Sequence, residues 1–147
     1  MRVYPPEVSA SLPHWPEGSA AVLCVTGPHA IPVSTAVRAG EQRLVFALGG
    51  RRATLATLRE SPSAALCLMA EGVAFTAHGR AEVIREPMEV GPLAALELRV
   101  EHVQDHLADG RTEMLAPAAW RWRQERAAEA DRGVRVELAA LAALGRR

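Results

Sequence analysis

The sequence predicts a mainly β domain, a small antiparallel barrel with one short helix after the third strand and a helical C-terminal tail. Six or seven short segments carry apolar residues at alternate positions or in unbroken runs, which is typical of strands. Glycine and proline punctuate the chain between these segments. A chain of 147 residues, 49% of them apolar, is long enough to bury about 68–70% of its unfolded surface in one core.

Three strands are expected before the helix. Ala20–Thr26 is a short apolar run that ends at a Gly-Pro turn. Ala30–Val37 alternates, and Pro32 within it favours a sheet edge or a strand start. A turn at Ala39-Gly40 leads into the third strand, Arg43–Leu48. We expect these three segments to form a meander.

A short helix follows the third strand. Gly49-Gly50 opens it, and the predicted helix covers Arg51–Glu60, with Leu55 and Leu58 on one face. Pro62 ends the helix, because proline disfavours helical geometry in the residue before it.

Three further strands are expected after the helix. Ala64–Met69 and Val73–Val83 flank a Glu-Gly turn, which predicts a hairpin. The second strand of this hairpin is long, and its small and apolar residues alternate with polar ones. A sixth alternating segment begins at Ala94 and runs on towards Val103.

The last part of the chain is predicted to form one more short strand and then a helical tail. Trp120 and Trp122 share a face if the chain is extended, so a seventh short strand is predicted there. We expect both indoles to pack at the barrel mouth or between subunits rather than to stack on a ligand. The tail is helical in pattern, with an interruption near Gly133. One domain, 1–147, is therefore predicted, with an N-terminal arm, a core and a tail at 1–19, 20–123 and 124–147.

The charge balance excludes several classes of function. Arginine supplies all 17 basic residues and 17 acidic residues oppose them, so the net charge is zero. A nucleic-acid-binding protein usually has a basic excess and a recognisable module, and neither is present. Because the sequence has no lysine, Schiff-base chemistry on a side chain is excluded, and with it the usual pyridoxal-phosphate mechanism.

The expected location is the cytoplasm. No apolar run reaches the roughly 18 residues of a membrane span. The N-terminal arm, in which Trp15 is the expected anchor, lacks the apolar core of a signal peptide. Cys24 and Cys67 lie in apolar runs, where buried free thiols are the default for an intracellular protein.

Several stretches, taken in order, resemble the pyridoxamine-phosphate-oxidase-like split-barrel family. They are "PHAIPVSTAV", "RLVFALGGRRATLATLRESPSAALCL" and "VAFTAHGRAEVI". That family has a Pro-x-x-Ser-type second strand, an aromatic residue near the end of the third strand, a basic and hydroxyl-rich corner, a Pro-stopped helix and a Gly-Arg-Ala strand. The corresponding segments here are Pro32–Ser34, Phe46–Leu48, Arg51–Thr54, Leu58–Pro62 and Gly79–Ala81. The resemblance covers roughly residues 20–103.

The resemblance implies a six-stranded split barrel that forms a homodimer and binds FMN in a groove between the subunits. Some branches of the family hold a deazaflavin coenzyme or haem instead. The phosphate meets the second and third strands and the corner after them, which makes the candidate cofactor-binding residues Ser34, Thr35, Leu48, Arg51, Arg52 and Thr54. Physical chemistry also supports a phosphate site at this corner, because a helix N-terminus offers free N–H groups and arginines add charge-assisted bonds to a phosphate.

The sequence departs from the family pattern at the corner. Leu48 stands where the family usually has threonine, and Thr54 where it usually has lysine. The second-strand arginine of the true oxidases falls near Ser34 and Thr35, and no basic C-terminal substrate segment is present. These differences argue against a genuine pyridoxamine-phosphate oxidase.

The expected function is therefore FMN binding, in an oxidoreductase acting on a small-molecule substrate or electron acceptor. Hydride transfer through a flavin needs no protein acid or base. The lack of a recognisable set of catalytic residues in the sequence therefore does not argue against an oxidoreductase. The alternatives are a deazaflavin-dependent reductase, a non-catalytic flavin- or haem-binding module, and a relative that has lost its cofactor.

Other polar residues give weaker signals. His78 and Arg80 share the polar face of the fifth strand, as solvent-facing or dimer-facing residues usually do. His102 and His106 have the i, i+4 spacing of metal ligands on a helix, but no third ligand accompanies them. We expect no metal site.

Overall fold

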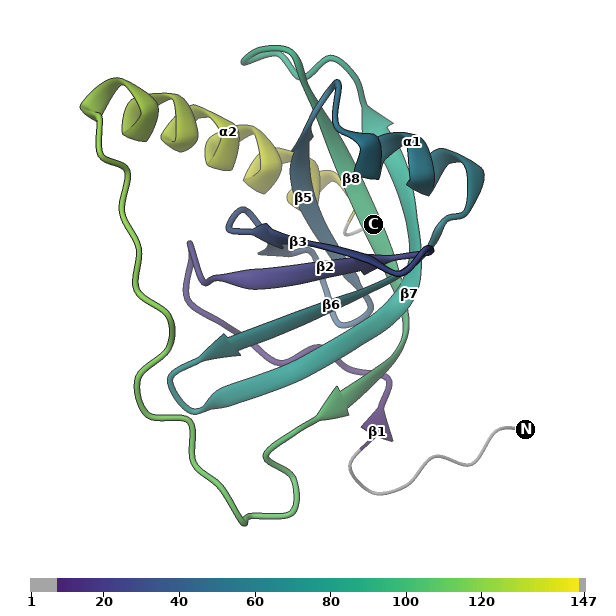
Figure 1. Ribbon diagram of the computed structural model, residues 1–147, viewed down its shortest axis with the longest axis vertical. Helices are drawn as coiled ribbons and strands as arrows, with labels where there is room; N and C mark the ends of the chain where they lie inside the picture. The colour runs from purple at the N-terminus through teal and green to yellow at the C-terminus, as the bar shows by residue number, and fades with distance from the viewer. Residues whose placement is uncertain (1–7, 146–147) are drawn as a thin grey trace.

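Two strands of thirteen residues, β7 and β8, form the spine of the fold (Figure 1). The computed structural model describes residues 8–145. Its elements, in chain order, are β1 (Val8–Ser9), β2 (Ala21–Val25), β3 (His29–Val33), β4 (Val37–Arg38), β5 (Arg43–Gly49), α1 (Ala53–Glu60), β6 (Ser63–Ala70), β7 (Val73–Arg85), β8 (Leu93–Asp105) and α2 (Glu125–Leu144).

The strands make one antiparallel sheet in the order β3-β2-β6-β7-β8-β5-β4, with β1 paired to β8. The two ends of this path, β3 and β4, are joined by only three residues, Ser34–Ala36. Because so short a link holds both sheet edges together, the sheet curls on itself (Figure 1). The mainly β fold with a helix after the early strands and a helical tail is as predicted. Residues 8–145 form eight strands instead of the six of the predicted barrel, and two of the eight have only two residues.

The predicted meander is wrong. β2 and β3 do form a hairpin, but β5 pairs with β8 and β4 at the other end of the sheet. The predicted strand Ala30–Val37 breaks at Ser34, because the chain there passes from one sheet edge to the other. Pro32 lies in the edge strand β3, where its missing N–H costs no ladder hydrogen bond.

The strands bury one face inside the curled sheet. The largest fully buried side chains come from every long strand: Phe46, Phe75, Leu23, Leu44, Leu66, Leu68, Leu96 and Leu98. Trp15 packs on Phe75, with ring centroids 5.3 Å apart, and its Nε1 donates to the carbonyl of Ala36 at 3.0 Å. Trp15 thus anchors the N-terminal arm, as the sequence predicts.

Helix α2 covers a second apolar cluster on the outside of the sheet. It packs on β4 and β5, whereas α1 packs on β2 and β7. The predicted interruption near Gly133 is wrong, since the helix runs unbroken from Glu125 to Leu144. Burial of Val134, Leu138 and Leu141 outweighs the low helix propensity of one glycine.

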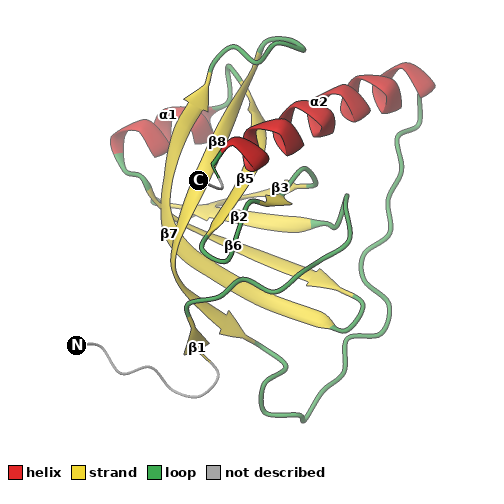
Figure 2. Ribbon diagram, turned by 180° about the vertical axis from the view of Figure 1, so that it is seen from behind, coloured by secondary structure: helices red, strands yellow, loops and turns green. Residues whose placement is uncertain are grey.

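A long connection leads from β8 to α2 along the outside of the sheet (Figure 2). The predicted seventh strand at Trp120 and Trp122 is also wrong, because this part of the connection has no secondary structure. The two indoles pack edge to face instead, with ring centroids 5.6 Å apart.

Both cysteines are free, as predicted, but Cys24 is exposed and Cys67 is only half-buried. Strand alternation explains the difference: Leu23 and Val25 take the inner face of β2, so Cys24 lies on the outer face. No helix between residues 8 and 145 is both long and apolar enough to cross a membrane.

Candidate functional site

A cavity of about 380 Å3 lies where the link after β3 and the end of β5 face helix α2. This volume falls in the range of roughly 300–1,000 Å3 that is usual for small-molecule sites. We call it the corner cavity, because the chain turns beside it from β5 into α1. It is lined mainly by apolar side chains, and its members are Ile31, Pro32, Val33, Ser34, Thr35, Ala47, Leu48, Gly49, Arg52, Leu93, Trp122, Ala127, Ala130, Asp131 and Val134.

Four of the six predicted site residues, Ser34, Thr35, Leu48 and Arg52, line this cavity. Thr35 Oγ1 accepts a hydrogen bond from the N–H of Ala47 at 3.0 Å, which fixes the link against β5. The Ser34 hydroxyl has no hydrogen-bond partner within residues 8–145, so it is available to a ligand. Leu48, which is buried, contributes an apolar wall.

Arg52 occupies the N-cap position of α1 with an extended backbone. No side chain caps this helix and its first turn holds no acidic residue. The N–H of Leu55 donates to the carbonyl of Arg52 at 3.1 Å, but the N–H groups of Ala53 and Thr54, at the very start of the helix, lack intrahelical acceptors. The Arg52 side chain is exposed and forms no ion pair with any residue of the described chain. An uncompensated positive charge and a bare helix N-terminus therefore meet at one end of the corner cavity.

The other two predicted residues, Arg51 and Thr54, do not line the cavity. Arg51 is exposed beside it, because adjacent residues at a helix start project in different directions. Thr54 is buried, and its Oγ1 lies 3.1 Å from Nε2 of His29 in a hydrogen bond that joins α1 to β3.

The wall opposite the strands comes from the C-terminal segment, which sequence reasoning did not include in the site. Trp122 and four residues of the first half of α2 form this wall. Among them Asp131 is an acid, and its Oδ2 lies 2.8 Å from Nε of Arg135. The apolar stripe of the tail predicts a packed helix, but no local pattern tells on which strands it packs.

A buried carboxylate fixes α2 to the loop between β7 and β8. Glu137 accepts hydrogen bonds from the N–H groups of Glu89 and Val90, each at 3.0 Å, and from Arg85 at 3.3 Å. Burial alone would raise the pKa of Glu137, but these hydrogen bonds and the charge of Arg85 outweigh it, so its pKa lies below the ordinary value. The carboxylate is therefore ionised at neutral pH and holds the helix in place.

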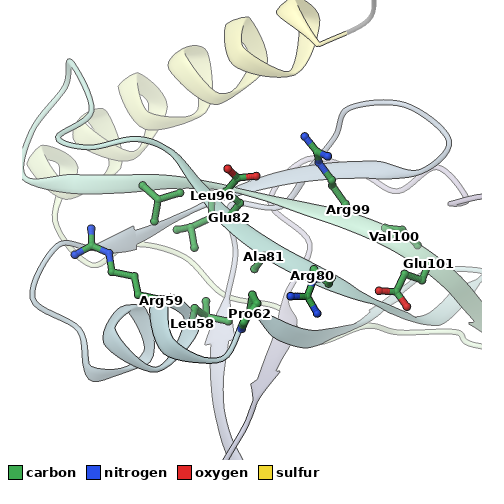
Figure 3. Close-up of a pocket in the computed structure, with 11 residues that line it drawn as sticks. Leu58, Arg59, Pro62, Arg80, Ala81, Glu82, Leu96, Arg99, Val100 and Glu101 are labelled. Carbon is green, nitrogen blue, oxygen red and sulfur yellow. The ribbon is translucent and has the colours of Figure 1, made fainter.

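A larger groove of about 660 Å3 lies between the end of α1 and the strands β7 and β8 (Figure 3). None of the six predicted site residues lines it. Two of its three arginines are already paired: Arg59 with Glu86, and Arg99 with Glu97 at 2.9 Å. Glu82 also lines this groove, so its charge is mixed. The corner cavity is the better candidate for a cofactor.

Three histidines, His78, His102 and His106, lie on the outer face of the sheet and do not line the corner cavity. His78 and His102 are cross-strand neighbours with stacked rings, 4.4 Å between centroids. His106 follows β8, and its Nε2 lies 2.7 Å from Thr76 Oγ1. His102 and His106 are not together on a helix, and no cluster of three metal-ligating side chains occurs in residues 8–145.

No protein-family model matches the sequence, and no curated protein is similar to it. Solved structures with the same arrangement of strands do exist. HupZ from group A Streptococcus is 12% identical over 69% of this chain and 90% of its own, with a TM-score of 0.52. General Stress Protein 26 from Bacillus anthracis is 11% identical over 60% of this chain and 84% of its own, with a TM-score of 0.50.

A pyridoxamine 5′-phosphate oxidase-like protein from Lactobacillus delbrueckii is 13% identical over 58% of this chain and 83% of its own, with a TM-score of 0.50. At these identities the likeness concerns the fold. The chain thus has the split-barrel fold of the pyridoxamine-phosphate-oxidase-like proteins, as its sequence predicts.

Proposed function

We propose that this split barrel binds FMN in the corner cavity, with the phosphate at the N-terminus of α1. The observation that carries the proposal is the state of Arg52. This arginine lines an apolar cavity, has no ion-pair partner in residues 8–145 and begins a helix that no side chain caps. Free N–H groups and an unpaired guanidinium are the donors that a phosphate dianion requires.

The rest of the cavity suits a flavin better than the alternative cofactors. A ring system needs apolar walls, which Ile31, Leu48 and Val134 supply. Haem needs an axial ligand, and the lining holds no histidine, cysteine, methionine or tyrosine. A deazaflavin coenzyme has a long anionic tail, and the corner offers only Arg51 and Arg52 to it.

We also propose that the protein is an oxidoreductase acting on a small molecule. A bound flavin supplies two-electron chemistry, and the protein supplies binding, orientation and exclusion of water. Asp131, the one acid in the lining, is ion-paired with Arg135, so no free acid or base faces the cavity. A non-catalytic flavin carrier would have the same lining. Absorption spectra recorded while the purified protein is incubated with reduced nicotinamide and oxygen separate these two cases. An oxidoreductase would oxidise the nicotinamide, whereas a carrier would leave its absorption unchanged.

Removing the Arg52 charge should weaken FMN and spare riboflavin, which lacks the phosphate. For Arg52→Ala we expect FMN affinity to fall about tenfold, because an exposed charge-assisted bond is lost. Riboflavin affinity should stay close to that of the original protein. Fluorescence titration of both flavins with both proteins measures the difference.

Arg51→Ala is the matched control, since Arg51 is the neighbouring exposed arginine and does not line the cavity. It should leave FMN affinity almost unchanged. Equal losses for the two flavins in Arg52→Ala, or no loss for either, would place the phosphate elsewhere.

A further inference from the structure

The corner cavity has a single aromatic side chain in its lining, that of Trp122. Building on the proposed flavin site, we infer that Trp122 is the surface on which the ring system of the bound cofactor stacks. Arg52 then holds the phosphate, and the C-terminal segment of the same chain holds the ring.

The surroundings of Trp122 suit this role. Its side chain is 45% exposed, although it stands beside an apolar cavity. The neighbouring Trp120 meets it edge to face at 84°, with ring centroids 5.6 Å apart. Trp120 is itself fixed, because its Nε1 donates to the carbonyl of Gly18 at 2.9 Å. A flat apolar ring is therefore held in position by a neighbour that is tied to the N-terminal arm.

An ion pair supports this arrangement from α2. The Arg135 guanidinium lies 5.8 Å from the centroid of the Trp120 ring, within reach of a cation–π interaction. The Nε of Arg135 also lies 2.8 Å from Asp131 Oδ2, and Asp131 lines the cavity. Because these contacts are all made by the protein's own side chains and backbone, the indole would need little further ordering to bind a ring.

The shape of the remaining wall fits a flat ring. Ala47 on the strand side and Ala127 and Ala130 on the helix side are small, so they leave room beside the indole. Aromatic systems prefer offset or edge-to-face contact, with centroids about 4.5–7 Å apart. A ligand ring on Trp122 would remove the exposed apolar surface of this indole from water.

Because Arg52 and Trp122 would hold opposite ends of the ligand, their substitutions should have different effects on the binding of the two flavins. A residue that contacts the ring should matter equally for riboflavin and FMN, because both carry the same ring. A phosphate-binding residue should matter for FMN alone. The ratio of the two affinities therefore distinguishes Trp122 from Arg52.

The test titrates riboflavin and FMN into the full chain and its Trp122→Ala and Trp122→Phe variants. Trp122→Ala should weaken both flavins by the same factor, about tenfold, the usual effect of removing an aromatic stacking partner. Trp122→Phe should retain most of the affinity. It should also brighten the fluorescence of the bound flavin, because an indole in contact quenches that emission by electron transfer and phenylalanine does not.

Leu115→Ala is the control, since Leu115 is a large exposed apolar residue of the same connection and does not line the cavity. It should change neither affinity, and circular dichroism confirms that each variant is folded. If Trp122→Ala binds riboflavin as well as the original protein, the inference is overturned while the Arg52 result stands by itself. If the original protein binds neither flavin, the proposed function and this inference both fail.

Discussion

Gly79 lies where two backbones approach too closely for any side chain. The β7·β8 register shifts between His78 and Gly79, and a Cβ added to Gly79 would lie 1.9 Å from the carbonyl oxygen of Arg99. The obstacle is backbone, so no side-chain rotation relieves it. The Gly-Arg-Ala motif of the sequence therefore has a structural basis, a bulge in the longest hairpin.

Gly79→Ala should destabilise the protein by about 1–3 kcal/mol or more, because the two long strands must separate locally. Urea unfolding followed by circular dichroism measures this change. Gly91→Ala is the control: Gly91 has no atom within 4 Å of its added Cβ and no positive φ. A stability of Gly79→Ala equal to that of the control would mean that the bulge is absent.

Single residues of the site could be predicted to different degrees. Arg52 and Ser34 could be found from sequence, because both belong to the corner motif and its facing strand. Thr54 belongs to the same motif but bonds to His29, and a hydrogen bond between residues so distant in sequence leaves no local pattern.

At the scale of the element, α2 depends on one ionised carboxylate. Glu137 is buried and accepts hydrogen bonds from two backbone N–H groups and from Arg85. Its pKa in the folded protein lies below the ordinary value of 4.5, so the unfolded chain binds the proton more readily. The stabilisation is complete above pH 4.5 and is lost as the pH falls through the folded pKa.

Glu137→Gln should lower the free energy of unfolding at pH 7 by about 1–3 kcal/mol, since the charge-assisted bonds are lost. As the pH falls from 5, the free energy of unfolding of the variant should also decrease less than that of the original protein, because the variant lacks the titrating group. Denaturant unfolding curves across that interval measure both effects.

Glu129→Gln is the matched control, because Glu129 is an exposed acid of the same helix and lies 3.8 Å from Arg132. Its stability should follow the original protein at every pH. An unchanged pH dependence in Glu137→Gln would assign the acid sensitivity to another group.

The elements themselves were predictable where the pattern is local. The segments that became β2, β5, β6, β7 and β8 and helix α1 follow from alternation and turn residues. The break between β3 and β4 was not predictable, because Ser34–Ala36 continues the alternation and only the pairing of two distant sheet edges bends the chain there.

At the scale of the whole molecule, the corner cavity joins distant parts of the chain. Its lining comes from residues 31–35, from residues 47–49 with Arg52, and from members of the segment between Trp122 and Val134, with Leu93 at the start of β8 beside them. The first two parts could be predicted together, because the family resemblance places them at one phosphate site. The third could not, because it follows a long connection without secondary structure, and its position is set by packing.

The outer face of β2 and β6 carries apolar side chains that the rest of residues 8–145 leaves exposed. Val22 and Met69 are 38% and 46% exposed, and Cys67 is the cross-strand neighbour of Val22. Removing side chains of this size from water against a second surface lowers the free energy. We propose that two copies of the chain pack through this face. A two-fold axis would place the face of one copy against the same face of the other.

Light scattering at micromolar concentration should accordingly give twice the chain mass of 15.8 kDa. Met69→Glu should shift the protein to the monomer, because it would bury two carboxylates near the two-fold axis without partners. Val136→Glu places the same charge on an exposed apolar residue of α2 and should leave the dimer intact. Since the lining of the corner cavity does not include Met69, the monomer should still bind riboflavin. A monomeric mass for the original protein would refute the dimer, and dissociation of only Val136→Glu would move the interface to α2.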